Sequence, residues 1–143
     1  MPSATFSHTV SVDASPTRAW EVLQDPDTWS RIGPVSDVTN PTYLEDGTLS
    51  GFDWVANVGG KKYDGSAVGG AYTTAERFTM TLDTSEIAGD VVATIAPGNP
   101  STDVTVEITF RTKGMLSAMF FPAIRQALAS GFPQQVEDLA AAI

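Results

Sequence analysis

Few side chains in this sequence could transfer a proton near neutral pH. His8 is the single histidine among 143 residues, and an imidazole titrates close to neutrality. It alternates with Phe6 and Val10 along a segment of period two, so it points to the same side as these apolar neighbours. His8 is therefore either a proton donor or acceptor at a cavity wall or a core histidine with one hydrogen bond. Tyr63 and Ser66 are the other weak candidates for a catalytic role.

Other kinds of chemistry lack the residues they need. With no cysteine and one histidine, the chain cannot form disulfides, a thiolate nucleophile or the common types of zinc site. The run Gly59-Gly60-Lys61-Lys62 lacks the upstream glycine and the Ser or Thr of a phosphate-binding loop. We therefore expect neither a metal nor a cofactor. The formal net charge of −9 argues against nucleic acid and anionic membrane as partners.

A predicted hairpin groups aromatic residues beside small ones. Residues 51–58 and 61–71 alternate as strands around a Gly59-Gly60 turn. A tight turn pairs Trp54 with Gly65, Phe52 with Ala67 and Ala56 with Tyr63. This arrangement indicates either fitted packing or room for another molecule. Asp53 and Asp64 fall on the opposite face, where we expect contact with solvent.

The remaining pattern predicts a mainly antiparallel sheet. Period-two alternation marks further strands over residues 5–12, 35–43, 75–82, 87–95 and 103–112. The strand over residues 35–43 is interrupted by Pro41, which favours an edge position. After the first strand, Ser15-Pro16 and Asp25-Pro26 are start signals for two short helices, the second of which carries Trp29 and Ile32.

The C-terminal segment organises the rest of the chain. From Gly114 to Ile143, apolar residues recur at steps of four and three, which predicts a long helix with a wide apolar surface. Pro122 and Pro133 interrupt its hydrogen bonds, and the kink is expected at Gly131-Phe132-Pro133. An antiparallel sheet with one apolar face can cover such a helix by curving around it. We therefore expect an α+β fold, with a single domain over residues 1–143.

Four runs of the sequence resemble the START-like superfamily (SRPBCC), specifically its polyketide cyclase/dehydrase and lipid-transport branch. They are HTVSVDASP (residues 8–16), AWEVL (19–23), DPDTW (25–29) and GMLSAMFFP (114–122). The resemblance implies the helix-grip fold, a seven-stranded curved sheet wrapped around the C-terminal helix with a cavity between them. It also implies a hydrophobic small molecule as the usual ligand, in a superfamily that includes carriers, receptors and enzymes.

The resemblance bears on two further positions. Trp29 corresponds to a tryptophan that aromatic cyclases of this superfamily keep at the pocket mouth. It either stacks on a flat ligand or anchors the helices to the sheet. Aromatase-like members use an arginine on a middle strand as a pocket acid, whereas this sequence has none between Arg31 and Arg77. Ser66 or Val68 occupies the comparable stretch, which counts against cyclase chemistry.

Three functional hypotheses follow. The first is binding of a lipid, acyl or polyketide-like molecule between sheet and helix, and the second is a cyclase/dehydrase that catalyses aldol cyclisation and dehydration. The third is a protein-interaction module without a ligand. The expected ligand-binding residues are Trp29, Phe52, Trp54, Tyr63, Phe78, Met80, Phe110, Met119, Phe120 and Ile124.

The sequence also bears on location and assembly. Its N-terminal stretch lacks the basic region and apolar run of a secretory signal, and Arg125 divides the most apolar region well short of a membrane span. We expect a cytoplasmic protein without membrane insertion, as a monomer or weak homodimer.

Overall fold

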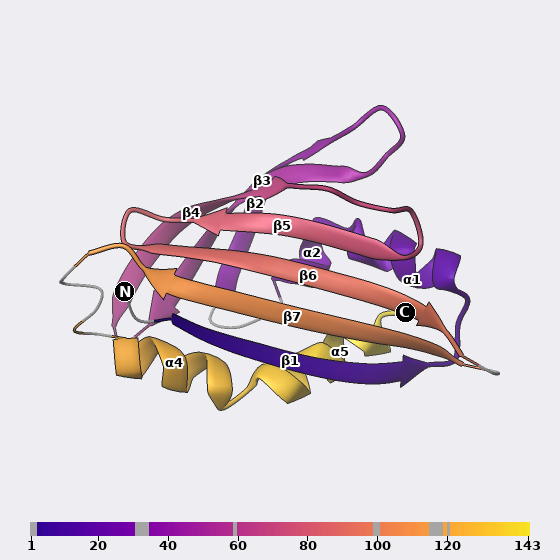
Figure 1. Ribbon diagram of the computed structural model, residues 1–143. Coiled ribbons are helices and arrows are strands. Elements are labelled where there is room, and N and C mark those ends of the chain that lie inside the picture. Colours follow the sequence, from indigo (N-terminus) through magenta and orange to yellow (C-terminus); the bar gives the residue numbers. More distant parts are fainter. Residues whose placement is uncertain (1–2, 31–34, 59, 99–100, 115–118, 120) are drawn as a thin grey trace.

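The computed structural model describes residues 3–30, 35–58, 60–98, 101–114, 119 and 121–143 (Figure 1). A seven-stranded antiparallel sheet has the spatial order β1-β7-β6-β5-β4-β3-β2. Its strands are β1 (Ser3–Val12), β2 (Val35–Tyr43), β3 (Leu49–Val58), β4 (Lys61–Gly69), β5 (Arg77–Asp83), β6 (Ile87–Pro97) and β7 (Thr102–Thr112). The helices are α1 (Pro16–Leu23), α2 (Pro26–Trp29), α4 (Phe121–Ala129) and α5 (Phe132–Ala141).

The sheet follows the alternation of the sequence closely. Side chains on one face of β7 are buried at every second position from Thr102 to Thr112, as period two requires. The predicted pairing of the β3–β4 hairpin is confirmed, with Trp54 opposite Gly65. β2 lies at the edge, as Pro41 predicted, and its pairing with β3 is irregular near Asn40, which has a φ of 52°. The strand bounds differ from the predicted ones by a few residues.

The two short helices begin where the sequence predicts. The Ser15 side chain accepts a hydrogen bond from the Arg18 backbone N–H at 3.2 Å, and Asp25 accepts one from the Asp27 N–H at 3.0 Å. Both bonds satisfy donors that a first helical turn leaves free. Ile32 lies outside the described residues. The Trp29 Nε1–H donates to the Leu23 carbonyl at 2.9 Å, which fixes α2 against the end of α1.

The single long C-terminal helix of the prediction is two helices in the described residues. α4 ends at Ala129, and α5 begins at Phe132 with Pro133 in its first turn. The restart at Gly131-Phe132-Pro133 is confirmed, since a proline lacks the N–H that a continuous helix needs but is well tolerated at a helix start. The predicted onset of the helix falls partly on residues 115–118 and 120, which lie outside the described part.

α5 closes the concave face of the sheet along β1 (Figure 1). Phe132, Val136, Leu139 and Ala140 of α5 are all buried. The Phe132 ring lies 6.2 Å from that of Phe6 on β1. The sheet therefore grips its last helix through an apolar contact, which is the defining feature of the helix-grip fold.

Replacing Phe132 with alanine tests this contact. Because the ring is 1% exposed, we expect Phe132→Ala to lower the free energy of unfolding by about 3–5 kcal/mol, through lost burial and an unfilled cavity. Glu137→Ala on the exposed side of α5 should change it by less than about 0.5 kcal/mol. Chemical denaturation measures both variants. Equal effects would mean that α5 is not anchored by its apolar side.

A polar contact joins two loops at the surface. The Tyr72 hydroxyl donates to Asp46 Oδ2 at 2.7 Å. This hydrogen bond raises the pKa of Tyr72 above its ordinary value of 10.0 and lowers the pKa of Asp46 below 3.8. A carboxyl group with a lowered pKa stabilises the fold above its unfolded pKa, and this stabilisation is lost as the pH falls through the folded value.

The Asp46 and Tyr72 pair predicts a pH effect. In Asp46→Asn, the Tyr72 phenol loses the carboxylate that holds its proton, so its pKa should fall toward the ordinary value. Ultraviolet absorbance during alkaline titration measures the shift, and Tyr72→Phe identifies which of the 3 tyrosines is responsible. An unchanged titration in Asp46→Asn would show that the hydrogen bond does not persist in solution.

Candidate functional site

The concave face carries the aromatic wall that the sequence predicts. Alternation and pairing put five of the expected ligand-binding residues on this face, each between 1% and 6% exposed. They are Phe52, Tyr63, Phe78, Met80 and Phe110. Met119 is instead 73% exposed and so lies at the surface. Phe120 lies outside the described residues, as does the side chain of Ile124.

One end of the concave face is filled by protein side chains. The Phe78 ring lies 6.0 Å from that of Trp29 and 5.9 Å from that of Trp20. Trp29 is buried and uses its N–H within the protein. This contact matches the interpretation of Trp29 as an anchor of α1 and α2 to the sheet.

At the opposite end, beside α4, several of the described side chains are only half-buried. Pairing along the sheet places the start of β1 and the end of β7 at this end, which we call the α4 end. Several apolar side chains there face inward and yet remain half-buried, namely Ala4, Trp54, Leu82, Ile87 and Phe121. Gly65, Ala67 and Gly89 add little or no side-chain volume to the same surface. Phe52, Tyr63 and Phe110 are buried at the same end, so among the described residues the partial exposure is local, around Leu82, Ile87 and Phe121.

Trp54 is the most distinctive side chain at the α4 end. A Cβ on Gly65 would collide with Cε2 and Cζ2 of the Trp54 ring, so the indole lies directly over the glycine. A side chain at Gly65 would project to the same face as the buried Tyr63 and Ala67. The indole thus occupies the concave face. Its Nε1–H is buried and has no hydrogen-bond partner among the described residues, a state that costs about 1–3 kcal/mol.

A charged pair lies at the edge of the aromatic wall. Lys61 Nζ is 5.3 Å from the centroid of the Tyr63 ring, and it contacts the Glu86 carboxylate at 2.6 and 2.7 Å. The hydrogen bond with Glu86 raises the pKa of Lys61. Its partner lies on a loop far along the chain, and no local pattern links the two.

The three weak catalytic candidates are not brought together. Across the sheet, Phe6 on β1 lies in one row with Gly69 on β4, because the strand pairing runs from Phe6 through Ile108, Val91 and Met80 to Gly69. Tyr63 lies six residues beyond Gly69 in one direction, which is about 20 Å at about 3.3 Å per residue. His8 lies in the other direction. Ser66 is paired with an outer-face residue and faces away from both, so no single ligand atom can reach all three side chains.

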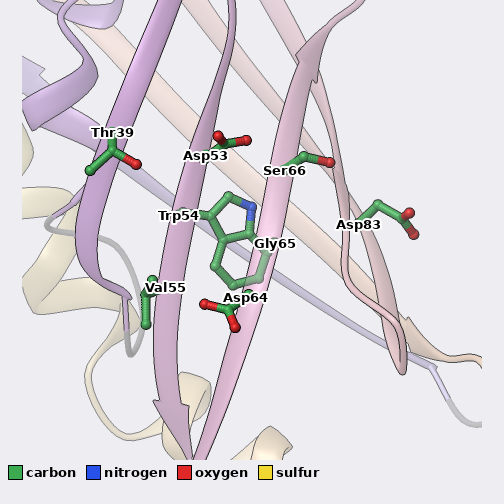
Figure 2. Close-up of a pocket in the computed structure, with 8 residues that line it drawn as sticks. All are labelled: Thr39, Asp53, Trp54, Val55, Asp64, Gly65, Ser66 and Asp83. Carbon is green, nitrogen blue, oxygen red and sulfur yellow. The ribbon is translucent and has the colours of Figure 1, made fainter.

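A pocket of about 460 Å³ lies over the outer face of β2 to β5 (Figure 2). It is lined by Thr39, Asp53, Trp54, Val55, Asp64, Gly65, Ser66 and Asp83. Most of its lining residues alternate to the side of the sheet opposite the predicted cavity, whereas Trp54 and Gly65 alternate to the concave side. Asp53 and Asp64 are exposed here, as the sequence predicted.

The carboxylates of the outer pocket already have partners. Asp53 accepts a hydrogen bond from Asn40 at 2.9 Å, Asp64 lies 3.8 Å from Lys62, and Asp83 lies 2.7 Å from Lys113. Within the described ranges, no three His, Asp or Glu side chains are grouped so that they could hold a metal ion. The outer pocket is therefore a solvated polar surface.

Comparison with known proteins identifies the family. The family described as "Polyketide cyclase / dehydrase and lipid transport" matches residues 3–143. The chain belongs to this family, within the START-like superfamily. A comparison with curated proteins found no match.

Solved structures agree on the fold. The Zhui aromatase/cyclase from Streptomyces sp. R1128 has a TM-score of 0.71 at 14% identity, covering 98% of this chain and 94% of that one. A protein from Thermus thermophilus has a TM-score of 0.71 at 13% identity, with coverage of 98% and 95%. A START superfamily protein from Mycobacterium smegmatis has a TM-score of 0.64 at 18% identity, with coverage of 94% and 98%. At these identities the likeness shows the helix-grip fold alone.

The helices of the described residues bear on membrane insertion. None of them combines the length and the apolar character needed to cross a membrane.

A Gly65→Ala substitution tests the position of the indole. The new methyl group would force the Trp54 ring away from β4, so we expect a loss of about 1–3 kcal/mol in the free energy of unfolding. The Trp54 indole N–H resonance should also shift. Ser66→Ala, the next residue on the other face, is the control and should stay within about 0.5 kcal/mol. If Gly65→Ala is as stable as the control, the indole does not lie over Gly65.

Proposed function

We propose that this protein binds a hydrophobic small molecule between the concave face of the sheet and its C-terminal helices, at the α4 end. The observation that carries the proposal is a group of inward-facing apolar side chains that remain half-buried. Among the described residues, Trp20, Trp29 and Phe78 pack together at the end beside α1 and α2, whereas Leu82, Ile87 and Phe121 at the α4 end are only half-buried. Membership of a family described by polyketide cyclases and lipid transport supports the same function.

Burial of apolar surface supplies the driving force for such binding. Each 100 Å² of apolar surface removed from water contributes about 2.5 kcal/mol, before the costs of association are subtracted. Leu82, Ile87 and Phe121 provide matching apolar surface on the protein. A ligand with rings or an acyl chain fits this surface better than a charged one.

A carrier or receptor role is favoured over catalysis. General acid–base catalysis needs titratable groups within hydrogen-bond reach of one reacting position. His8, Tyr63 and Ser66 lie far apart or on opposite faces. Lys61 is held by Glu86, so its charge is not free to stabilise an enolate. The likeness in fold to an aromatase/cyclase therefore does not extend to a proposal of that reaction.

The cytoplasmic location inferred from the sequence stays a prediction.

The direct test is mass spectrometry of the intact protein purified from its own host under native conditions, followed by organic extraction. We expect a small apolar molecule to remain bound and to be recovered in the extract. A protein that carries nothing, and whose melting temperature is unchanged by panels of fatty acids and fused-ring aromatics, would contradict the proposal.

A substitution that fills the α4 end tests the location of the site. Leu82 is half-buried on the concave face, so Leu82→Trp should occupy ligand space and weaken the binding of a naphthalene probe at least about tenfold, or about 1.4 kcal/mol. Thr81→Trp adds the same ring on the exposed outer face and should leave affinity unchanged. Titration calorimetry measures both. Weakened binding in Thr81→Trp alone would move the site to the outer face.

A further inference from the structure

We propose that Trp54 and Gly65 form a subsite that binds a neutral oxygen acceptor of the ligand, such as a ketone, ester or hydroxyl oxygen, through the indole N–H. This inference rests on the proposed function. It adds the chemical class of the ligand, because it requires an oxygen atom on an otherwise apolar molecule.

The position of the indole is set by the absence of a side chain at residue 65. Trp54 and Gly65 are directly paired across β3 and β4, and any Cβ on Gly65 would overlap the ring. The ring is therefore held against the strand with its N–H in a defined place. The indole as a whole is only half-buried, whereas its Nε1 atom is fully buried, so a ligand that contacts the exposed part of the ring must displace neighbouring side chains to reach the N–H.

Neighbouring acceptors are already engaged. The Thr84 hydroxyl oxygen accepts hydrogen bonds from the backbone N–H groups of Glu86 and Ile87 in the turn after β5. The Glu86 carboxylate is bound by Lys61. The Trp54 Nε1–H, by contrast, is buried without a partner among the described residues. Since buried donors are nearly always paired, an acceptor from outside the chain is the natural complement.

The surroundings favour a neutral oxygen over a carboxylate. Of the inward-facing groups beside Trp54 at the α4 end, Ala67 on β4 and Leu82 on β5 are apolar, and Tyr63 on β4 adds a phenol. The nearby cation Lys61 is neutralised by Glu86. A carboxylate buried in such a place would lack a counter-charge, and the net charge of the chain is −9. A carbonyl or hydroxyl oxygen needs only the single donor that Trp54 provides.

A pair of probes of nearly equal shape tests the subsite. 2-Acetylnaphthalene carries a carbonyl oxygen, and 2-ethylnaphthalene does not. We expect the wild-type protein to bind the ketone about fivefold more tightly, as one net hydrogen bond allows. Trp54→Phe keeps an aromatic ring but removes the donor, so the ratio of the two affinities should fall to about one. Trp20→Phe, which alters a ring packed on Phe78 at the other end, should keep the fivefold ratio.

A spectroscopic measurement identifies the donor. In an ¹⁵N-labelled protein, the ketone should shift the indole N–H resonance that is missing from Trp54→Phe, and 2-ethylnaphthalene should shift it much less. Equal affinities of the wild type for the two probes, or an unchanged ratio in Trp54→Phe, would overturn the subsite but leave the cavity in place. Tighter binding of 2-naphthoate than of the ketone would overturn the choice of a neutral acceptor. Failure of all three probes to bind would count against the cavity itself.

Discussion

The structure depends on the need to cover one apolar face of a curved sheet. Alternating side chains on seven strands create this face, and water contact with it would be unfavourable over its whole area. α5 covers the part along β1 with Phe132, Val136 and Leu139, and α1 and α2 cover another part through Trp20 and Trp29. At the α4 end, Leu82, Ile87 and Phe121 remain half-buried among the residues that the structure describes. We therefore place the proposed site where the apolar face of the sheet is least buried by the described helices.

The same reasoning explains how the two aromatic groups differ. Trp29 donates its N–H to a backbone carbonyl and packs on Phe78. Its N–H therefore has an acceptor, and its ring has an apolar contact, within the chain. Trp54 packs on Gly65 but leaves its N–H without a partner among the described residues. Two tryptophans facing one interior can therefore have different roles. The first stabilises the fold, and we assign the second to a ligand.

Much of the fold could be predicted from the sequence, because local patterns determine it. Alternation predicted the strands, Ser15-Pro16 and Asp25-Pro26 predicted the helix starts, and the Gly59-Gly60 turn predicted the pairing of Trp54 with Gly65. The break of the C-terminal helix at Pro133 was also predictable, since proline acts locally. Each of these features depends on residues close together in the chain.

The candidate site was harder to predict because it depends on distant residues. No pattern near Trp29 shows that Phe78 fills the space beside it. The half-buried state of Leu82 and Ile87 depends on segments distant in the chain that pack on the sheet, and the ion pair of Lys61 depends on Glu86 in a later turn. Ser66 was a candidate for the pocket, but its pairing with Asp53 places it on the outer face. The period-two alternation of the predicted hairpin is enough to exclude Ser66 from the concave face.

The central claim is that a hydrophobic ligand binds at the α4 end of the concave face. Intermolecular nuclear Overhauser effects between bound 2-acetylnaphthalene and protein methyl groups test it most directly. The claim predicts contacts with the methyl groups of Leu82 and Ile87 and none with those of Val136 and Leu139. Contacts confined to Val55 on the outer face, or to Val136 and Leu139 of α5, would contradict it.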